Sequence, residues 1–530
     1  MPLHVRPDQF HYASRRSDVF ADNIVATSQP LATQAGLDML RRGGNAIDAA
    51  LATAICLTVV EPTSNGIGSD AFAIISSGGE LHGFNGSGKS PAAWTPERFG
   101  QDRRRIEIGW DSVTVPGAVD TWVQLSNRFG RLDFAELFEP AIRYAKNGFH
   151  VTPVIQRQWA GAVDLFGHFE AFRDTFLPGG RAPEVGELMR LPEHAASLEK
   201  IASSRGEAFY RGELAQQMAA DCQSHGGVMS MDDLAAHSGF WVEPISQQYG
   251  NIRVHEIPPN GQGLGALIAL GILEHLDLGA QPVDSPQSMH LQIEAMKLAF
   301  VDAFTEIADP GHMNCSWQDL LDPARLQKLA QTISPHRALE LVSPRRRDRG
   351  TVYLCSADAE GNMVSMIQSN FEGFGSGIVV PGTGISLQNR GAGFTLEPGH
   401  ANQVAGGKRP FHTIIPGFIT DKDGAVGPFG VMGAHMQAQG QVQVVLRMFE
   451  YGQQPQEAMD APRWHISEGF ELSLEAGFPD GTRAALEQLG HKFEAETGWG
   501  TFGGGQSIMR GAHGLRAASD PRKDGAAAGF

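Results

Sequence analysis

The feature that most constrains the fold is an abrupt change of character at residue 350. Residues 344–350, PRRRDRG, are polar and basic, which indicates an exposed linker. The segment TVYLCSAD begins directly after them at Thr351, and MVSMIQS follows a turn over 359–362. Two strand-like segments joined by such a turn predict a β-hairpin. The sequence therefore predicts a domain or subunit boundary at 350/351, followed by a hairpin that starts on a threonine.

The two sides of this boundary differ in their expected secondary structure. Helical spacing of apolar residues predicts helices in the first 300 residues, at 31–40, 45–60, 192–201, 213–222 and 287–303. Short strands and glycine turns are expected after residue 350. Of the 64 glycines, 31 fall in the last 180 residues, more than twice the usual share of about 7%. Because glycine permits tight turns and close backbone approach, this surplus points to the active site.

Charge and hydropathy exclude several classes of protein. The chain carries 42 Lys and Arg against 59 Asp and Glu, and its net charge of −17 is the opposite of what nucleic-acid binding needs. The longest apolar run, 49–60, is too short to cross a bilayer. The first residues lack the apolar stretch of a secretory signal. We therefore expect a cytoplasmic protein with neither nucleic acid nor a membrane as partner.

No metal or cofactor site is predicted. The 19 histidines form no H-E-x-x-H motif and no tight cluster with carboxylates along the sequence. The cysteines are few and form no C-x-x-C pair, which suits neither a zinc site nor a disulfide framework. They are Cys56, Cys222, Cys315 and Cys355.

One motif supports a different class of function. Residues 83–90, GFNGSGKS, fit the nucleotide-binding pattern G-x-x-x-x-G-K-[ST] at every position. A P-loop needs a helix directly after it, whose N-terminus holds the phosphates, but Pro91 and Pro96 follow here. In a glycine-rich chain a chance match is the better interpretation. A nucleotide-binding protein that uses Gly83–Ser90 is the alternative from another class.

Thr351 could act as a nucleophile if the chain is cut directly before it. A threonine at the start of a strand is ordinarily just a β-branched residue of a sheet. Cleavage between Gly350 and Thr351 would free an α-amine beside the threonine hydroxyl. An α-amine has a pKa of roughly 7.7–8, so it can act as a general base near neutral pH and activate the hydroxyl as a nucleophile.

The sequence resembles the gamma-glutamyltransferase family over almost its whole length. An N-terminal signature runs from Ser28 to Gly68 and includes 43–50, GGNAIDAA, and 59–62, VVEP. Further matches to the large subunit of that family are 115–117, VPG, 209–212, FYRG, and 232–234, DDL. Matches to its small subunit are 351–362, 374–378, FGSGI, 506–508, QSI, and 518–522, ASDPR.

This resemblance implies an α+β fold, the four-layer αββα sandwich of the N-terminal nucleophile hydrolases. It implies a precursor that cuts itself at Gly350–Thr351 into a large subunit, 1–350, and a small catalytic subunit, 351–530. Thr351 would then attack an amide and form an acyl-enzyme. Ser369 falls where the family has a hydroxyl residue that hydrogen-bonds to the nucleophile. Gly433 and Ala434 fall where backbone N–H groups form the oxyanion hole, and alanine keeps that N–H.

The residues expected to bind substrate depart from the family pattern. The family's arginine for the glutamyl α-carboxylate is missing from its place, where the nearest cation is Lys89. The acidic residue for the α-ammonium falls at Gly393, which has no side chain. Arg390 replaces a neutral amide residue, and a family serine pair maps onto His412 and Thr413. We therefore expect substrate contacts from Lys89, Arg390, His412 and Thr413.

These departures favour an anionic acyl group that lacks an α-amine. The predicted function is hydrolysis of an oxamate- or glutaryl-like amide, as in the oxamate amidohydrolase and acylase branch of the family. A γ-glutamyl transferase or glutathione hydrolase is the alternative within the family, and an uncleaved, inactive binding protein is a third. For Arg390 and His412, simple structural pairing is the alternative to substrate binding, and the two interpretations have nearly equal support. The expected partners are a small-molecule amide and the protein's own two subunits, with a homodimer of the processed pair as an option.

Overall fold

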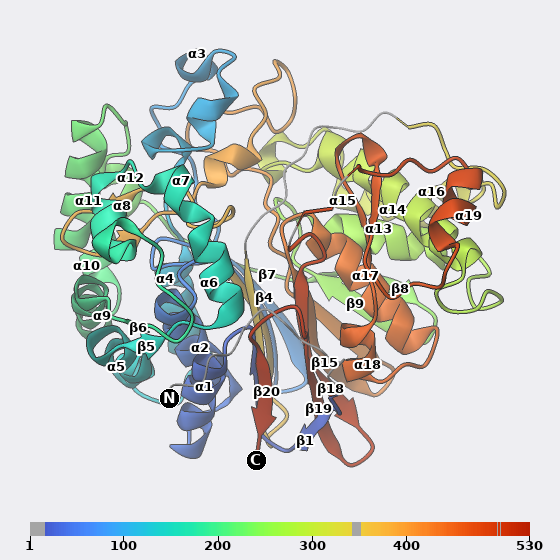
Figure 1. Cartoon of the computed structure of the whole chain (residues 1–530), viewed down its shortest axis with the longest axis horizontal. Helices are drawn as coiled ribbons and strands as arrows, with labels where there is room; N and C mark the ends of the chain where they lie inside the picture. The colour runs from blue at the N-terminus through green and yellow to red at the C-terminus, as the bar shows by residue number, and fades with distance from the viewer. Residues whose placement is uncertain (1–15, 342–350, 496, 499) are drawn as a thin grey trace, which may run out of the picture.

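Two seven-stranded antiparallel sheets lie face to face at the centre of the protein in a computed structural model (Figure 1). The structure describes residues 16–341, 351–495, 497–498 and 500–530. Sheet I has the strand order β1 (Val19–Ala21), β19 (Gly514–Ser519), β18 (Gly504–Gly511), β15 (Gly424–Met432), β14 (Gly417–Asp421), β9 (Ile252–Glu256) and β8 (Ile245–Tyr249). Sheet II has the order β20 (Ala526–Gly529), β2 (Ile24–Thr27), β10 (Val352–Ala357), β11 (Met363–Ser369), β3 (Asp70–Ser77), β4 (Glu80–Asn85) and β7 (Phe240–Val242).

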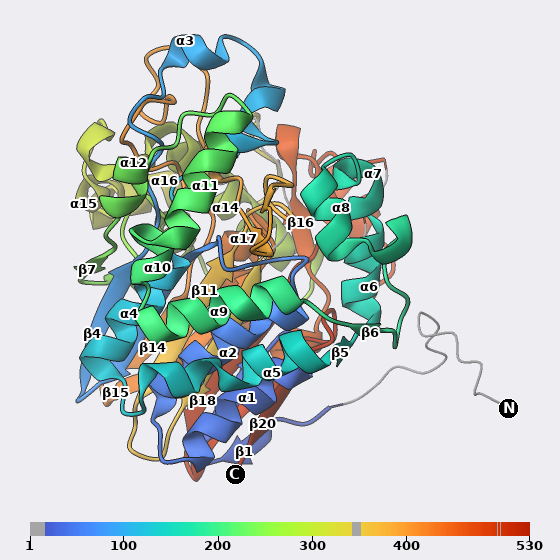
Figure 2. The ribbon, with the colours of Figure 1, turned by 90° about the vertical axis from the view of Figure 1, so that its left-hand side faces the viewer.

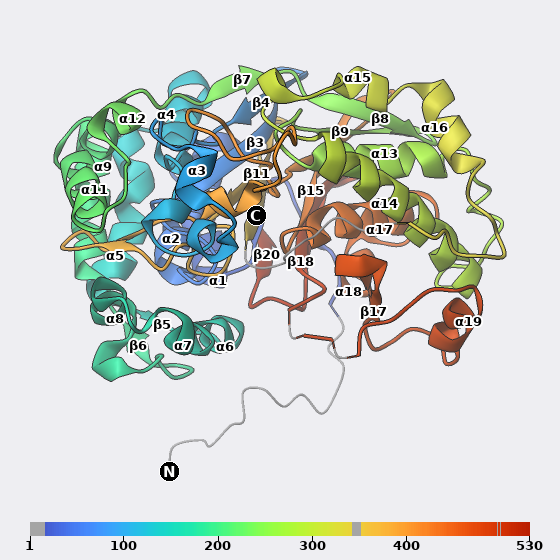
Figure 3. The same ribbon diagram turned by 90° about the horizontal axis from the view of Figure 1, so that it is seen from above.

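Helices cover the outer face of each sheet and complete four layers (Figure 3). Sheet II carries α1 (Pro30–Arg41), α2 (Ala46–Val60) and α4 (Ala118–Phe129), with α2 running across the sheet in Figure 2. Sheet I carries α13 (Gly263–Leu273) and α17 (Met436–Phe449), and α14 (Pro286–Glu306) packs against α13. The predicted αββα sandwich is therefore confirmed.

An apolar core fills the space between the sheets. Successive side chains of a strand point to opposite faces, and on β10 Tyr353 and Cys355 point into this core. Phe72 of β3 joins them from the same sheet, and Phe418 and Ile508 come from sheet I. Because the other faces of both sheets are also covered by apolar helices, strands such as β10 and β11 are buried along their whole length.

The predicted helices are present, with small differences at their ends. They correspond to α1, α2, α9 (Pro192–Ser204), α11 (Glu213–Ser224) and α14. The helix α2 is apolar and buried on every side, as its composition predicts. It begins where expected because Asn45 and Asp48 form a capping box, each accepting a backbone N–H of the other at 3.0 Å.

Shorter elements complete the chain. The remaining helices are α3 (Pro96–Phe99), α5 (Glu139–Asn147), α6 (Pro153–Ala160), α7 (Ala162–Phe166), α8 (Glu170–Phe176), α10 (Glu207–Tyr210), α12 (Met231–Ala235), α15 (Trp317–Leu320), α16 (Pro323–Ala330), α18 (Pro455–Asp460) and α19 (Thr482–Gln488). Three two-stranded ribbons pair β5 (Phe149–His150) with β6 (Leu188–Met189), β12 (Val379–Val380) with β13 (Ile385–Ser386), and β16 (Trp464–Ile466) with β17 (Leu472–Leu474). None of the described helices has the length and apolar character that crossing a bilayer requires.

The hairpin predicted after residue 350 is β10–β11, in the middle of sheet II. Strand β10 pairs with β2, and β11 pairs with β3, so strands from both sides of residue 350 are combined in one sheet. Sheet I likewise combines β8 and β9 with β14 and β15. The boundary therefore does not separate two folding units. As a subunit boundary it stays a prediction, because Gly350 lies outside the described residues.

Candidate active site

Thr351 lies directly before β10 and is 1% exposed. Its Oγ1 is 3.2 Å from Oγ of Ser369, the last residue of the paired strand β11. The Ser369 Oγ also accepts a hydrogen bond from Phe371 N at 2.8 Å. Either hydroxyl can donate in the contact between Ser369 and Thr351. The hairpin thus places two hydroxyl groups in contact at the open ends of its strands.

The loop between β15 and α17 brings Gly433 and Ala434 to the same region. Both have left-handed backbone conformations, with φ of +122° and +46°, which L-residues other than glycine rarely adopt. Neither N–H donates a hydrogen bond to another described residue. The Ala434 carbonyl is held by Gln262 Nε2 at 2.8 Å. Two unused N–H groups in a fixed loop at the N-terminal end of a helix can stabilise a negatively charged oxygen.

A cavity of about 1600 Å³ opens onto these groups, and Thr351 and Gly433 both line it. Residues of α6 and α7 form part of its wall, together with the loop after β11 and residues 497–498 and 500–503. Charged side chains of both signs face it, including Glu107, Arg157, Glu372, Glu475, Arg522 and Lys523. Its size leaves room for a leaving group much larger than ammonia.

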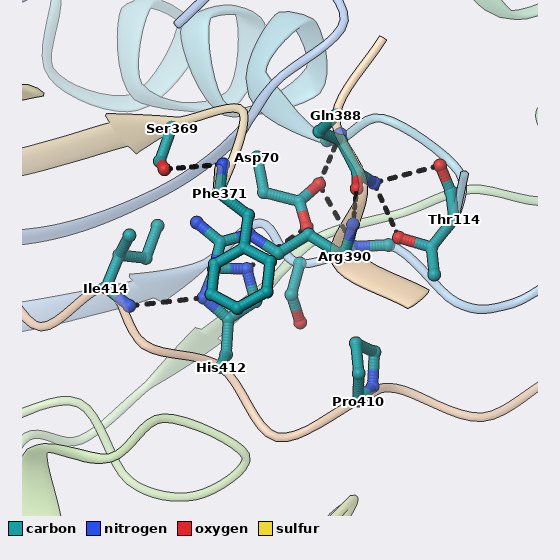
Figure 4. A network of polar contacts seen from close by, with 12 residues as sticks. Asp70, Thr114, Ser369, Phe371, Gln388, Arg390, Pro410, His412 and Ile414 are labelled. Carbon is teal, nitrogen blue, oxygen red and sulfur yellow. Dashed lines mark hydrogen bonds and ion pairs between the residues drawn. The ribbon is translucent and has the colours of Figure 1, made fainter. Parts of the chain in front are cut away.

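Arg390 lies in a buried polar network next to this cavity (Figure 4). Its Nη1 donates to Thr413 Oγ1 at 2.8 Å, and the Phe371 ring covers the guanidinium with 4.8 Å between Cζ and the ring centroid. Phe371 has a left-handed φ of +78°. In the described part of the chain, Nε and Nη2 of Arg390 have no hydrogen-bond partner. A fully buried guanidinium thus has one unused edge.

Asp70 and His412 form the second half of this network. His412 Nε2 is 3.1 Å from Asp70 Oδ2, while Asp70 Oδ1 accepts Gly117 N at 2.9 Å. Burial raises the pKa of Asp70 to about 7, opposed mainly by the charge of Arg390. Burial together with Arg390 holds the pKa of His412 well below its ordinary value. His412 is therefore neutral, and because its Nδ1 accepts the Ile414 N–H at 3.4 Å, its Nε2–H is directed at Asp70.

The predicted substrate-binding residues divide into two groups. Arg390, His412 and Thr413 come together, but they do not line the cavity in the described part of the structure. Lys89 is exposed and is also absent from that lining, so its predicted substrate contact finds no support. A Cβ at Gly393 would lie 2.5 Å from the Phe411 carbonyl oxygen, so this position has no space for a side chain.

Three contributors to the site were missed by sequence reasoning. Asp70 follows the N-terminal signature and opens an apolar strand, where a lone acid is unusual. Arg409 donates its Nε to the Ser87 carbonyl at 3.0 Å, at the place where the family arginine is missing. Gln437 is buried in α17 and donates to Thr351 Oγ1 at 3.4 Å. The signal for Gln437 is a row of four glutamines, at 437, 439, 441 and 443, in a helix whose other residues are apolar apart from Arg447.

The nucleotide-binding alternative is wrong in its structural premise. Residues 83–85 are the end of β4, and in the described part of the chain no helix begins until α3 at Pro96. A Cβ at Gly88 would lie 1.5 Å from the Val115 carbonyl oxygen, so backbone rather than a phosphate occupies the space at that glycine. The motif therefore lacks the helix N-terminus that holds phosphates.

One His/carboxylate cluster forms that the sequence did not reveal. His290, Glu294 and His491 gather between α14 and the segment after α19. His290 Nδ1 lies 2.8 Å from His491 Nε2. Lys297 Nζ is 2.9 Å from Glu294 Oε1 and 3.1 Å from His491 Nδ1. These polar atoms satisfy one another, and Lys297 donates to both Glu294 and His491. We therefore interpret the cluster as a buried structural network.

Comparison with known proteins places the chain in a family. The family model described as gamma-glutamyltranspeptidase matches residues 32–530. The glutathione hydrolase-like YwrD proenzyme of Bacillus subtilis is 36% identical over 97% of this chain and 100% of that protein. The oxamate amidohydrolase proenzyme of Klebsiella pneumoniae is 35% identical over 97% and 99%. The crystal structure of a cephalosporin acylase from Bacillus halodurans is 48% identical, covers 100% of this chain and 99% of its own, and has a TM-score of 0.94.

Proposed function

Since the chain belongs to the gamma-glutamyltranspeptidase family, we propose that it is a self-processing amidohydrolase for a small anionic acyl donor. The protein is an enzyme of the N-terminal nucleophile amidohydrolase and acyltransferase class. Cleavage between Gly350 and Thr351 gives a large subunit, 1–350, and a small subunit, 351–530, which stay together through the shared sheets. The names of two relatives include the word proenzyme, which supports such processing.

The unused edge of Arg390 carries the choice of an anionic donor. Its Nε–H and one Nη2–H point in the same direction and match the two oxygens of a carboxylate. Leaving buried donors unpaired costs stability, which a bound carboxylate removes. Because Phe371 covers the flat face of the guanidinium, the carboxylate binds in the plane of the guanidinium, at its unused edge. Thr413 orients the guanidinium from its opposite side.

The position of Gly393 supports a donor without an α-amine. The family resemblance assigns the ammonium-binding acid to this position, and the Phe411 carbonyl oxygen occupies the space that any side chain there would need. The site thus combines a cationic anchor with the loss of an anionic one. An oxamate- or glutaryl-like acyl group satisfies both conditions, and the name of the Klebsiella relative, an oxamate amidohydrolase, agrees with the first of these two groups.

The chemistry follows from the groups around Thr351. The freed α-amine takes the proton of Oγ1, and Oγ1 attacks the amide carbonyl carbon. The N–H groups of Gly433 and Ala434 stabilise the negative charge on the carbonyl oxygen. The ammonium then returns its proton to the leaving nitrogen as the C–N bond breaks, which leaves an ester on Thr351. Water attacks this ester by the same route and releases the carboxylic acid.

A matched pair of substrates tests this proposal. Glutaryl and γ-glutamyl p-nitroanilides differ only in the α-ammonium group, and oxamate is assayed beside them by ammonia release. We expect kcat/KM for the glutaryl anilide to exceed that for the γ-glutamyl anilide by about tenfold or more, equivalent to one charged contact. A preference for the γ-glutamyl anilide overturns the anionic-donor proposal in favour of a glutathione hydrolase.

The homodimer and the cytoplasmic location stay predictions.

A further inference from the structure

Gln437 contacts the atom that the proposed function makes the nucleophile. Its side-chain amide is fully buried and bridges two partners. Its Oε1 accepts the backbone N–H of Ile415 at 3.1 Å, which fixes the orientation of the amide. Its Nε2 therefore faces Thr351 Oγ1 and donates to it at 3.4 Å. Because Gln437 donates to Oγ1, it cannot be the general base, which would have to accept the Oγ1 proton.

We propose that Gln437 is a second hydrogen-bond donor to the nucleophile, an inference that rests on the proposed function of Thr351. A hydroxyl oxygen has two lone pairs, and Ser369 and Gln437 approach Oγ1 from two different elements. When the α-amine removes the proton, Oγ1 gains a third lone pair. The two donors hold two of the three, and the remaining one attacks the carbonyl carbon. The contacts thus stabilise the alkoxide and set its direction.

The position of Gln437 links three parts of the site. It lies one turn of α17 beyond Ala434 and donates its own backbone N–H to the Ala434 carbonyl at 3.2 Å. Through Ile415 it also restrains the segment that carries Thr413. A single residue therefore connects the nucleophile, the oxyanion loop and the anion-binding segment. A shift of the oxyanion loop or of the anion-binding segment would therefore change the position of Gln437 Nε2 relative to Oγ1.

Gln441 provides a matched control on the same helix. It lies one turn further along α17, is buried, and donates its Nε2 to the Ile415 carbonyl at 2.6 Å. It pins the same residue as Gln437, but none of its hydrogen bonds reaches Thr351. Gln441→Met removes a buried amide and one contact to Ile415, as Gln437→Met does. Only Gln437→Met also removes a donor from the nucleophile.

The test measures self-cleavage and turnover in the full-length protein. With Gln437→Met we expect about a tenfold loss in the rate at which the small subunit appears and in kcat, the value of one hydrogen bond, with KM unchanged. With Gln441→Met we expect both rates to stay near those of the unaltered protein. Equal losses in the two variants, or no loss in Gln437→Met, overturn the proposal. Thermal unfolding identifies any variant that fails to fold.

Gln437→Glu keeps the hydrogen bond to Ile415 but removes the one to Thr351. It also tests the proposal if Gln437→Met does not fold. A carboxylate still accepts the Ile415 N–H, but it cannot donate to Oγ1. We expect kcat of Gln437→Glu to fall as pH rises and the carboxyl ionises, and a profile parallel to that of the unaltered protein overturns the inference. An unaltered protein that neither cleaves itself nor hydrolyses any of the amides removes the proposed function as well. Normal activity with an insensitive Gln437 removes only this inference.

Discussion

The hydroxyl oxygens of Thr351 and Ser369 lie 3.2 Å apart at the paired ends of β10 and β11. Eighteen residues separate them in sequence, and the strand register alone brings them together. Ser369 is held in turn by Phe371 N, so the position of the Thr351 hydroxyl is defined at the open end of a buried hairpin. Strands buried on both faces move little, which suits a group that must attack in one direction.

Thr351→Ala is expected to abolish both cleavage and amide hydrolysis, because alanine has no nucleophilic oxygen. The 57.0 kDa chain should remain a single band on a denaturing gel. The unaltered protein should give fragments of about 38 and 19 kDa, in proportion to the lengths of 1–350 and 351–530. Thr351→Ser keeps an oxygen and should still cleave. An active unaltered protein that stays intact would refute the assignment of Thr351.

Arg390→Met should raise KM for the glutaryl anilide by about 10- to 100-fold, the value of a hydrogen-bonded charge. Arg390→Lys should recover only part of this loss, because an ammonium group cannot form the bidentate contact. Lys89→Met is the matched control, since it removes an exposed cation and should leave KM unchanged. Initial rates across substrate concentration distinguish the variants. Equal KM values for Arg390→Met and Lys89→Met would contradict the role of Arg390 in binding.

Asp70→Asn should become more stable relative to the unaltered protein as pH rises from 4 to 7. The folded state raises the pKa of Asp70 to about 7, whereas the unfolded value is about 3.9. A group with a raised folded pKa contributes its full stability below the unfolded pKa and loses it as pH rises through the folded one. Asparagine does not ionise and escapes that loss, which is at most about 4 kcal/mol. Urea unfolding at several pH values measures the difference, and a pH-independent difference would exclude this effect.

Gly393→Ala should lower the free energy of unfolding by about 1–3 kcal/mol, as overpacking in a core does. The added Cβ would lie 2.5 Å from the Phe411 carbonyl oxygen and 3.2 Å from Pro410 Cβ. Gly311→Ala is the control, because there the nearest atom to the new Cβ is 3.8 Å away. Urea unfolding of both variants gives the comparison. If the two variants prove equally stable, the space at Gly393 is open and an acidic anchor could be built there.

Local patterns in the sequence predicted much of the secondary structure and led to the proposal that Thr351 is the nucleophile. The apolar run of α2 with its Asn45 cap, and the two strands around the turn at 359–362, involve only neighbours along the chain. Thr351 could be singled out because a basic linker stands directly before its strand. Gln437 could not, since a buried glutamine in an apolar helix reads equally well as a packing residue. Its contact with Thr351 spans 86 positions and depends on the packing of sheet II against sheet I.

By itself, the sequence determined the family, the hairpin that begins at Thr351 and the cationic character of position 390, because these depend on residue order and local chemistry. Only the tertiary structure decided that Arg390 is buried beneath Phe371, that Lys89 faces solvent and that Gly393 has no room for an acid. Each of these depends on which distant backbone fills the neighbouring space. Such contacts arise when two sheets and their helices pack together, and no local pattern encodes the resulting distances.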